Sequence, residues 1–197
     1  MELMLFTNDV ELSSKAYESD IDRVVIDLEN IGKSRRQRGS NLEVNKHKIE
    51  DIRLIKSAKP ITVMCRLNPL NKGSQEEIEL SLAAGADILM LPMFSKAIEV
   101  ERFIEWTGKR ARTSILFETR ESVEEIESFK GLDVDEVYVG LNDLGLSFGY
   151  VFQYQLVAEG LVDRVRENFP TSDFGFGGIT ILDKGDPIPT RNIIKEL

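Results

Sequence analysis

The chain has 197 residues, of which 42% are hydrophobic and 30% are charged, and its formal net charge is −9. This composition is typical of a globular protein, so residues 1–197 are expected to form one large α/β domain. The acidic balance disfavours nucleic acid and anionic membrane surfaces as partners. A single cysteine excludes an intrachain disulfide, and no apolar run is long enough for a membrane span. Small molecules are the expected partners, in a reducing cytoplasm.

Short apolar runs alternate with longer amphipathic segments along the whole chain. Seven of these runs are predicted to be β-strands, at residues 3–7, 23–29, 61–68, 87–93, 113–119, 136–141 and 173–179. The runs are nearly continuous, which indicates strands that are buried on both faces. Strands and helices that alternate in this way predict a parallel sheet covered by helices.

Helices are predicted at residues 48–57, 74–84, 95–107, 122–129 and 154–168. The clearest of them has Ser74 as its expected N-cap, with Glu77 three residues later, and it stops at Gly85.

Seven such units favour a TIM-type (β/α)8 barrel whose eighth unit is missing. Residues 189–197 begin a further helix but are followed by no strand, and typical barrels have about 250 residues. We therefore expect the chain to be truncated at its carboxyl end. The alternative is an open doubly wound sheet, which is disfavoured because no glycine-rich turn follows the first strand.

Polar side chains gather where the predicted strands end, which is where barrel enzymes place their chemistry. They are Asp27, Glu29 and Asn30 after the second strand, Arg66 and Asn68 after the third, Glu118 after the fifth, and Asn142 and Asp143 after the sixth. Glu118 and Asp143 suit a hard cation such as Mg²⁺ or Mn²⁺, or they cap the helices that follow. Arg66 is expected to bind a carboxylate, either that of a substrate or that of Glu29 or Glu118.

Four further features have both a functional and a structural interpretation. Lys33 and Arg36, in a basic loop, could contact a phosphate or a second carboxylate, or be solvated. Gly177-Gly178 either lets the backbone approach a ligand or allows a tight bend. His47, the sole histidine, lies near the start of a helix, and a catalytic role is the less favoured interpretation. Cys65 is expected to pack in the core rather than act as a nucleophile.

Five segments match one known family in the same order along the chain. They are DRVVIDLE (22–29), CRLNP (65–69), GADILMLPM (85–93), FET (117–119) and VGLNDL (139–144). These segments resemble the HpcH/HpaI aldolase and citrate lyase family, whose barrel is of the phosphoenolpyruvate/pyruvate type. The resemblance implies that Glu118 and Asp143 bind Mg²⁺ or Mn²⁺, and that Arg66 holds the carboxylate end of the substrate.

The resemblance also implies an activity. The expected enzyme is a metal-dependent carbon–carbon lyase or aldolase that acts on a 2-oxo acid or an acyl-CoA thioester through a pyruvate- or oxaloacetate-type enolate. Asp27 and the backbone of Gly140, Leu141 and Asn142 are the other expected substrate contacts. Family members are commonly trimers or hexamers, so a homo-oligomer is expected.

Position 30 departs from the family. Members that act on hydroxy-oxo acids resemble Asp-x-Glu-His after the second strand, whereas this chain has Asn30. An amide does not act as an acid or a base at neutral pH, so Glu29 or metal-bound water is expected to transfer the proton. Two alternatives stay open. One is a catalytically idle barrel that binds a carboxylated metabolite, and the other is a phosphoenolpyruvate-utilising enzyme.

Overall fold

The computed structural model describes residues 2–32, 46–177, 188–189 and 191–192. Lys33, Arg36 and Gly178 therefore lie outside the described residues, as does most of the predicted terminal helix. The predicted absence of an eighth unit likewise falls on this end of the chain and stays a prediction.

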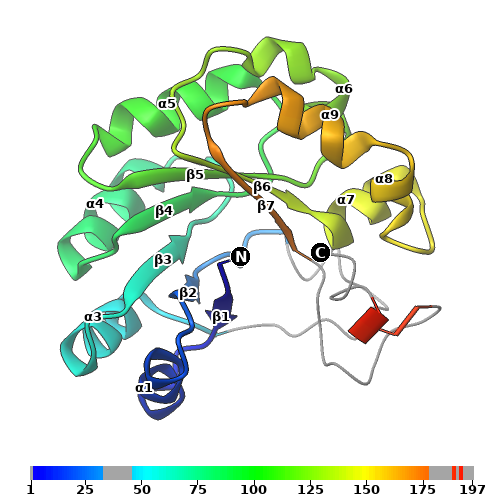
Figure 1. Cartoon of the computed structure of the whole chain (residues 1–197). Helices are drawn as coiled ribbons and strands as arrows, with labels where there is room; N and C mark the ends of the chain where they lie inside the picture. Colours follow the sequence, from blue (N-terminus) through cyan, green and yellow to red (C-terminus); the bar gives the residue numbers. More distant parts are fainter. Residues whose placement is uncertain (1, 33–45, 178–187, 190, 193–197) are drawn as a thin grey trace.

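The described residues contain a seven-stranded parallel sheet whose strands follow one another in sequence order from β1 to β7. The strands are β1 (Met4–Phe6), β2 (Arg23–Asp27), β3 (Thr62–Arg66), β4 (Ile88–Leu91), β5 (Arg112–Phe117), β6 (Glu136–Gly140) and β7 (Asp173–Gly177). The sheet curls into a half-barrel with the helices on its outer face (Figure 1). All seven predicted strands are present. A doubly wound sheet would reverse its strand order, so that alternative is wrong.

Side chains along the strands alternate between two apolar clusters. The larger, outer cluster joins strand residues such as Ile26 to helix residues such as Ile52 and Phe103, and it fills the space between the sheet and the outer helices. The smaller, inner cluster contains Val25, Met64, Ile88, Met90 and Leu116, which face the inside of the curl.

This alternation places the polar residues at the strand ends. Side chains two residues apart on a strand point to the same face. Because Val25, Met64 and Leu116 face inward, the side chains two positions later also face inward, at the carboxyl end of the half-barrel. These side chains are Asp27, Arg66 and Glu118.

The helices are α1 (Val10–Glu18), α3 (Ile49–Ala58), α4 (Ser74–Ala84), α5 (Ala97–Thr107), α6 (Arg120–Glu124), the 3₁₀ turn η1 (Ile126–Phe129), α7 (Leu141–Phe148), α8 (Gln155–Ala158) and α9 (Leu161–Asn168). Several helix predictions need correction. The continuous helix expected at 154–168 is divided, because Gly160 adopts a left-handed φ of 74°. The helix expected at 122–129 is divided into α6 and η1. Helices α1 and α7 were not predicted, and α7 begins at Leu141, the last residue of the predicted sixth strand.

The predicted N-cap of α4 is also wrong. Gly73 is the N-cap, while the Ser74 hydroxyl accepts a hydrogen bond from the Asn71 N–H at 2.8 Å. Glu77 does not turn back to the start of its own helix; instead, its carboxylate binds Asn68. Gly85 ends the helix in a left-handed conformation, as predicted.

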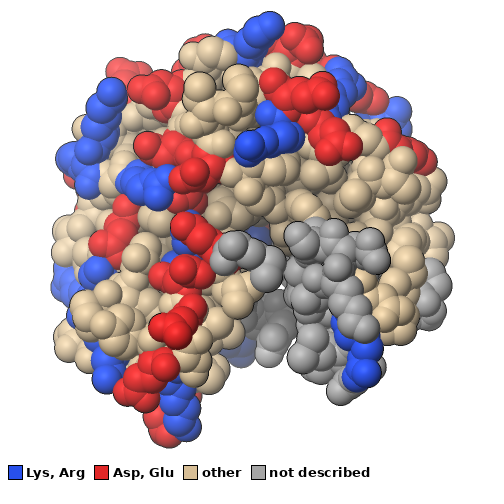
Figure 2. Space-filling model, in the orientation of Figure 1, with Lys and Arg blue, Asp and Glu red and all other residues tan. Residues whose placement is uncertain are grey.

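Acidic and basic side chains are interspersed over the outer helices (Figure 2). Exposed apolar side chains occur around α7 and α8, where Leu146, Val151 and Val157 reach the surface. Among the described residues, no helix combines the length and the hydrophobicity that crossing a membrane requires.

Candidate active site

An ion pair between a buried carboxylate and a partly buried guanidinium joins the carboxyl ends of β2 and β3. The strand register sets Asp27 beside Arg66, whose Nε and Nη2 atoms donate to the two carboxylate oxygens of Asp27 at 2.9 and 2.8 Å. Glu29 lies farther away, with its Oε2 atom 3.6 Å from Nη2 of Arg66. If Arg66 formed an ion pair within the protein, the sequence predicted Glu29 or Glu118 as its partner. The structure instead shows Asp27 as the partner that binds two guanidinium nitrogens.

The surroundings of Arg66 fix its charge and its orientation. Burial alone would lower the pKa of Arg66, but the bonds to Asp27 and the negative charges of Asp27, Glu118 and Glu29 raise the pKa above its ordinary value. The ring of Phe6 covers the guanidinium, with its centroid 5.3 Å from Cζ. Arg66 is therefore a permanent, oriented positive charge among acidic side chains.

Glu118 follows β5 and is only 3% exposed. Its Oε1 atom accepts a hydrogen bond from the Met93 N–H at 3.1 Å. The cap of the next helix is Thr119, whose hydroxyl accepts the Ser122 N–H at 3.2 Å. The capping alternative for Glu118 is therefore wrong, and its carboxylate faces the mouth of the half-barrel.

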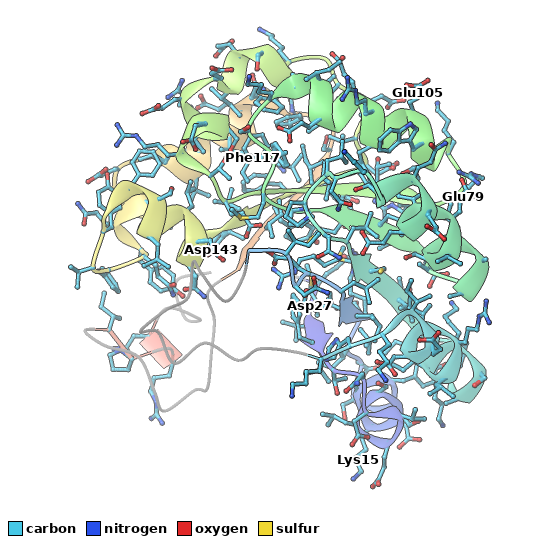
Figure 3. All side chains as sticks on the ribbon, turned by 180° about the vertical axis from the view of Figure 1, so that it is seen from behind. Lys15, Asp27, Glu79, Glu105, Phe117 and Asp143 are labelled. Carbon is cyan, nitrogen blue, oxygen red and sulfur yellow. The ribbon has the colours of Figure 1, made fainter. Side chains whose placement is uncertain are left out.

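Asp143 lies in the first turn of α7 and is half-buried. Strand β6 passes directly into this helix at Gly140, so Gly140, Leu141 and Asn142 form the N-cap and first residues of α7. A carboxylate in this position is favoured by the helix dipole, which agrees with the helix-start alternative for Asp143. Figure 3 shows Asp27 and Asp143 within the body of the molecule, while Lys15, Glu79 and Glu105 lie on the outer helices.

The carboxylates of Glu118 and Asp143 have the ligand chemistry that a hard divalent cation prefers. In the part of the chain that the structure describes, no three His, Cys, Asp or Glu side chains are grouped closely enough to hold a metal by themselves. Mg²⁺ does not need such a cage, because one or two carboxylates usually bind it together with water and substrate oxygens. The absence of a side chain at Gly140 makes room for the Glu118 carboxylate, since a Cβ there would lie 3.0 Å from Oε2.

Two other residues singled out in the sequence have clear positions. His47 lies at the end of β2, where its Nδ1 atom accepts the Asp27 N–H at 2.9 Å. Cys65 is fully buried in the outer cluster, and burial raises the pKa of its thiol to about 12. The packing role predicted for Cys65 is confirmed. Gly177 ends β7 opposite Gly140, and no atom of the described residues beyond its chain neighbours lies within 4 Å of where a Cβ would be.

Sequence reasoning missed the contact between Asn68 and Glu77. Asn68 is 8% exposed, and both its backbone N–H and its Nδ2 donate to the Glu77 carboxylate, at 3.1 and 2.6 Å. The available signal was the spacing. In the predicted strand 61–68, Asn68 follows Arg66 by two residues, which predicts both side chains on one face, and Glu77 lies in the first turn of the next predicted helix.

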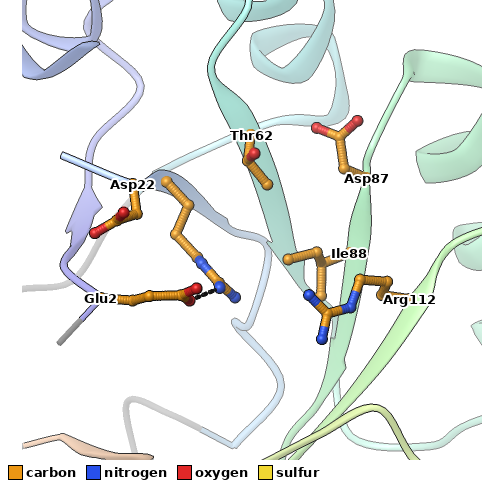
Figure 4. A pocket seen from close by; sticks show the side chains of 7 residues that line it. Glu2, Asp22, Thr62, Asp87, Ile88 and Arg112 are labelled. Carbon is orange, nitrogen blue, oxygen red and sulfur yellow. Dashed lines mark hydrogen bonds and ion pairs between the residues drawn. The ribbon is translucent and has the colours of Figure 1, made fainter. Parts of the chain in front are cut away.

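A cavity of about 390 Å³ lies at the opposite end, where the strands begin (Figure 4). Its lining residues are Glu2, Asp22, Arg23, Thr62, Asp87, Ile88 and Arg112. Arg23 is buried and bonded to Glu136 at 2.7 Å, while Nη1 of Arg112 lies 3.2 Å from the second Glu136 oxygen without hydrogen-bond geometry. Because barrel enzymes react at the carboxyl ends of their strands, we interpret this cavity as part of a structural ion-pair network.

The family model for HpcH/HpaI aldolase/citrate lyase matches residues 2–156. An HpcH/HpaI aldolase from Desulfitobacterium hafniense DCB-2 has a similar structure, with a TM-score of 0.70 and 16% identity over 91% of this chain and 78% of that chain. An HpcH/HpaI aldolase/citrate lyase family protein from Burkholderia cenocepacia J2315 has a TM-score of 0.70 and 15% identity over 90% and 79% of the two chains. Citrate synthase SbnG has a TM-score of 0.70 and 17% identity over 99% and 81%. No curated protein matches the sequence significantly.

Proposed function

Since the chain belongs to the HpcH/HpaI aldolase/citrate lyase family, we propose that it is a divalent-metal-dependent carbon–carbon lyase or aldolase. The proposed substrate is a 2-oxo acid or an acyl-CoA thioester whose cleavage passes through a pyruvate- or oxaloacetate-type enolate. One observation supports the proposal above all. The partly buried, oriented Arg66 guanidinium and the buried Glu118 carboxylate both face inward at the carboxyl end of the half-barrel.

Glu118 and Asp143 are the residues that would hold the cation, as Mg²⁺ or Mn²⁺. When bound, the ion supplies Lewis-acid stabilisation of the negative charge that develops on the enolate oxygen. The protein holds Glu118 ready for this role through the Met93 N–H and the space at Gly140.

Arg66 would bind the carboxylate end of the substrate. The mouth is rich in acidic side chains, so an anionic substrate needs a fixed positive charge to offset their repulsion. Because both carboxylate oxygens of Asp27 accept from Arg66, Asp27 would act through Arg66 rather than as a direct substrate contact. The N–H groups at the start of α7, around Leu141 and Asn142, would add hydrogen bonds to the substrate.

Glu29 is the group proposed to move the proton. In a retro-aldol cleavage, a base removes the hydroxyl proton, the carbon–carbon bond breaks, and its electron pair becomes the enolate, which is then protonated on carbon. Glu29 is 2% exposed and lies next to Arg66, so its carboxylate is close to the proposed carboxylate site. The side-chain amide of Asn30 does not ionise at neutral pH, so it cannot act as a general acid or base.

A coupled assay tests the proposal. Purified protein is supplied with Mg²⁺ or Mn²⁺ and a panel of hydroxy-oxo acids, acyl-CoA thioesters and phosphoenolpyruvate, and the release of pyruvate or oxaloacetate is followed with lactate or malate dehydrogenase. We expect product from at least one substrate, and we expect it to disappear with a chelator and return with added metal. Product release that is unaffected by chelation would contradict metal dependence.

A catalytically idle barrel that binds a carboxylated metabolite is the second candidate, and Asn30 is the observation that favours it. Oxalate resembles the pyruvate enolate and serves as a binding probe. Calorimetric binding of oxalate in the presence of Mn²⁺, together with no product from any substrate of the panel, would favour the idle barrel over the lyase.

A further inference from the structure

The segment that leaves β2 is held by an unusual set of acceptors. Each of its first five backbone N–H groups is matched to an acceptor, and only one of these acceptors is a backbone carbonyl. The bonds run from Asp27 to His47 Nδ1 (2.9 Å), from Leu28 to the Arg66 carbonyl (2.9 Å), from Glu29 to Asp27 Oδ1 (3.2 Å), and from Asn30 and Ile31 to Asn68 Oδ1 (2.9 and 3.1 Å). The shape of this turn is therefore set mainly by side chains, and two of them, His47 and Asn68, come from outside the turn.

Asn68 makes the largest contribution to this arrangement, because its single side-chain oxygen receives two successive N–H groups. This works only if the amide oxygen, and not the amide nitrogen, faces the turn. A flipped amide would set its own N–H groups against the two backbone donors.

Glu77 determines which way the Asn68 amide faces. One carboxylate oxygen of Glu77 accepts from Nδ2 of Asn68 at 2.6 Å, and the other accepts from the Asn68 backbone N–H at 3.1 Å. With its nitrogen held by Glu77, the amide has to direct its oxygen at the turn. Glu77 lies in the first turn of α4, where the helix dipole favours a carboxylate.

We propose that Asn68 and Glu77 are positioning residues for the lyase reaction. Glu77 orients the Asn68 amide, and Asn68 fixes the turn that carries Glu29, so that the Glu29 carboxylate stays beside Arg66. The inference rests on the proposed function, in which Glu29 moves the proton. Neither Asn68 nor Glu77 needs to touch the substrate.

The hydrogen-bond pattern allows a reciprocal exchange of the amide and the carboxylate. Asn68→Asp alone places two carboxylates next to each other, and they repel. Glu77→Gln alone replaces one acceptor oxygen with an NH2 group, which then faces an N–H donor of Asn68. The double variant Asn68→Asp/Glu77→Gln restores every bond. The carboxylate at position 68 accepts both turn N–H groups and the new amide N–H, while the amide oxygen at position 77 accepts the backbone N–H of residue 68.

Kinetics on a substrate that the wild type cleaves test the role in catalysis. We expect each single variant to lower kcat about tenfold while KM changes by less than about twofold, because the proton-transfer group is displaced while substrate binding is kept. The double variant should recover kcat to within about threefold of wild type. Glu79→Gln is the matched control, because Glu79 lies on the same helix but pairs with Arg110 at the surface.

Hydrogen exchange measured by mass spectrometry on the peptide that spans residues 27–32 gives a readout without substrate. We expect slow exchange in the wild type and in Glu79→Gln, faster exchange in each single variant, and slow exchange again in the double variant. If Asn68→Asp does not fold, Glu77→Gln alone carries the test, with faster exchange and a lower kcat expected.

The outcomes separate this inference from the function on which it rests. A wild type that cleaves its substrate, with a double variant no better than the single variants, overturns the positioning role alone. Unchanged exchange in Glu77→Gln does the same. A different result counts against the lyase instead. In that case, exchange is slow in the wild type, faster in the single variants and slow again in the double variant, but the wild type cleaves nothing in the panel. The catalytic role of Asn68 and Glu77 is then overturned together with the lyase.

Discussion

Gly140 and Glu118 are matched in space, because a Cβ atom at position 140 would lie 3.0 Å from Oε2 and 3.1 Å from Cβ of Glu118. Both residues stand at carboxyl strand ends, on the neighbouring strands β5 and β6. A Cβ at position 140 requires the Glu118 side chain to move by a few tenths of an ångström. The glycine thus leaves the space that this carboxylate occupies.

Gly140→Ala should therefore weaken metal binding without removing any ligand. We expect the affinity for Mn²⁺, measured by titration calorimetry, to fall about tenfold, which is the usual effect of disturbing the surroundings of a ligand. Gly177→Ala is the matched control, because Gly177 pairs with Gly140 and has open space around its Cβ position. Equal affinities in the two alanine variants would count against this account of Gly140.

The ion pair between Asp27 and Arg66 should contribute to the free energy of unfolding. Arg66→Met leaves the buried Asp27 carboxylate without its bidentate partner, and this should lower the free energy of unfolding in urea by about 3–5 kcal/mol. The double variant Asp27→Asn/Arg66→Met removes the charge as well and should be the more stable of the two. A double variant that is as unstable as the single one would show that the buried charge is not the cause.

Gly175 should not tolerate a side chain. A Cβ at this position would lie 2.5 Å from Cε1 of Tyr138, whose ring packs against the inner cluster. Gly175→Ala should lower the free energy of unfolding by about 1–3 kcal/mol through overpacking, as measured by chemical denaturation. Tyr138→Leu in the same chain should recover part of the loss. No loss in the single variant would be inconsistent with this contact.

Cys65 should be chemically silent in the native protein. Burial raises its thiol pKa to about 12, so almost no thiolate exists at neutral pH and reagents do not reach it. We expect no alkylation by iodoacetamide at pH 7.5, as judged by intact mass, and full alkylation after unfolding in guanidinium. Rapid modification of the folded protein would place Cys65 at the surface, contrary to its position in the outer cluster.

The strands and their order were predictable because fully buried parallel strands consist of continuous apolar runs. Strand β4 is the clearest case, since all four of its residues are apolar and buried. Helix α7 was missed because its apolar start, at Leu141, reads as a continuation of the sixth strand. Gly149, which ends α7 with a left-handed φ of 77°, was the available signal of a helix end.

The residues at the strand ends were predictable, but their partners were not. Which acid pairs with Arg66 depends on the register of β2 against β3, and this register sets Asp27 beside it rather than Glu29. The contact between Asn68 and Glu77 depends on where α4 begins. A capping box inside α4 would satisfy the same sequence pattern, and only the three-dimensional arrangement distinguishes the two.

The central claim is that Glu118 and Asp143 together hold a divalent cation. Calorimetric titration of Mn²⁺ into wild type, Glu118→Gln, Asp143→Asn and the surface control Glu79→Gln tests it most directly. We predict one site in wild type and in the control, with affinity reduced at least about tenfold in each of the other two variants. Equal affinity in all four proteins would contradict the claim.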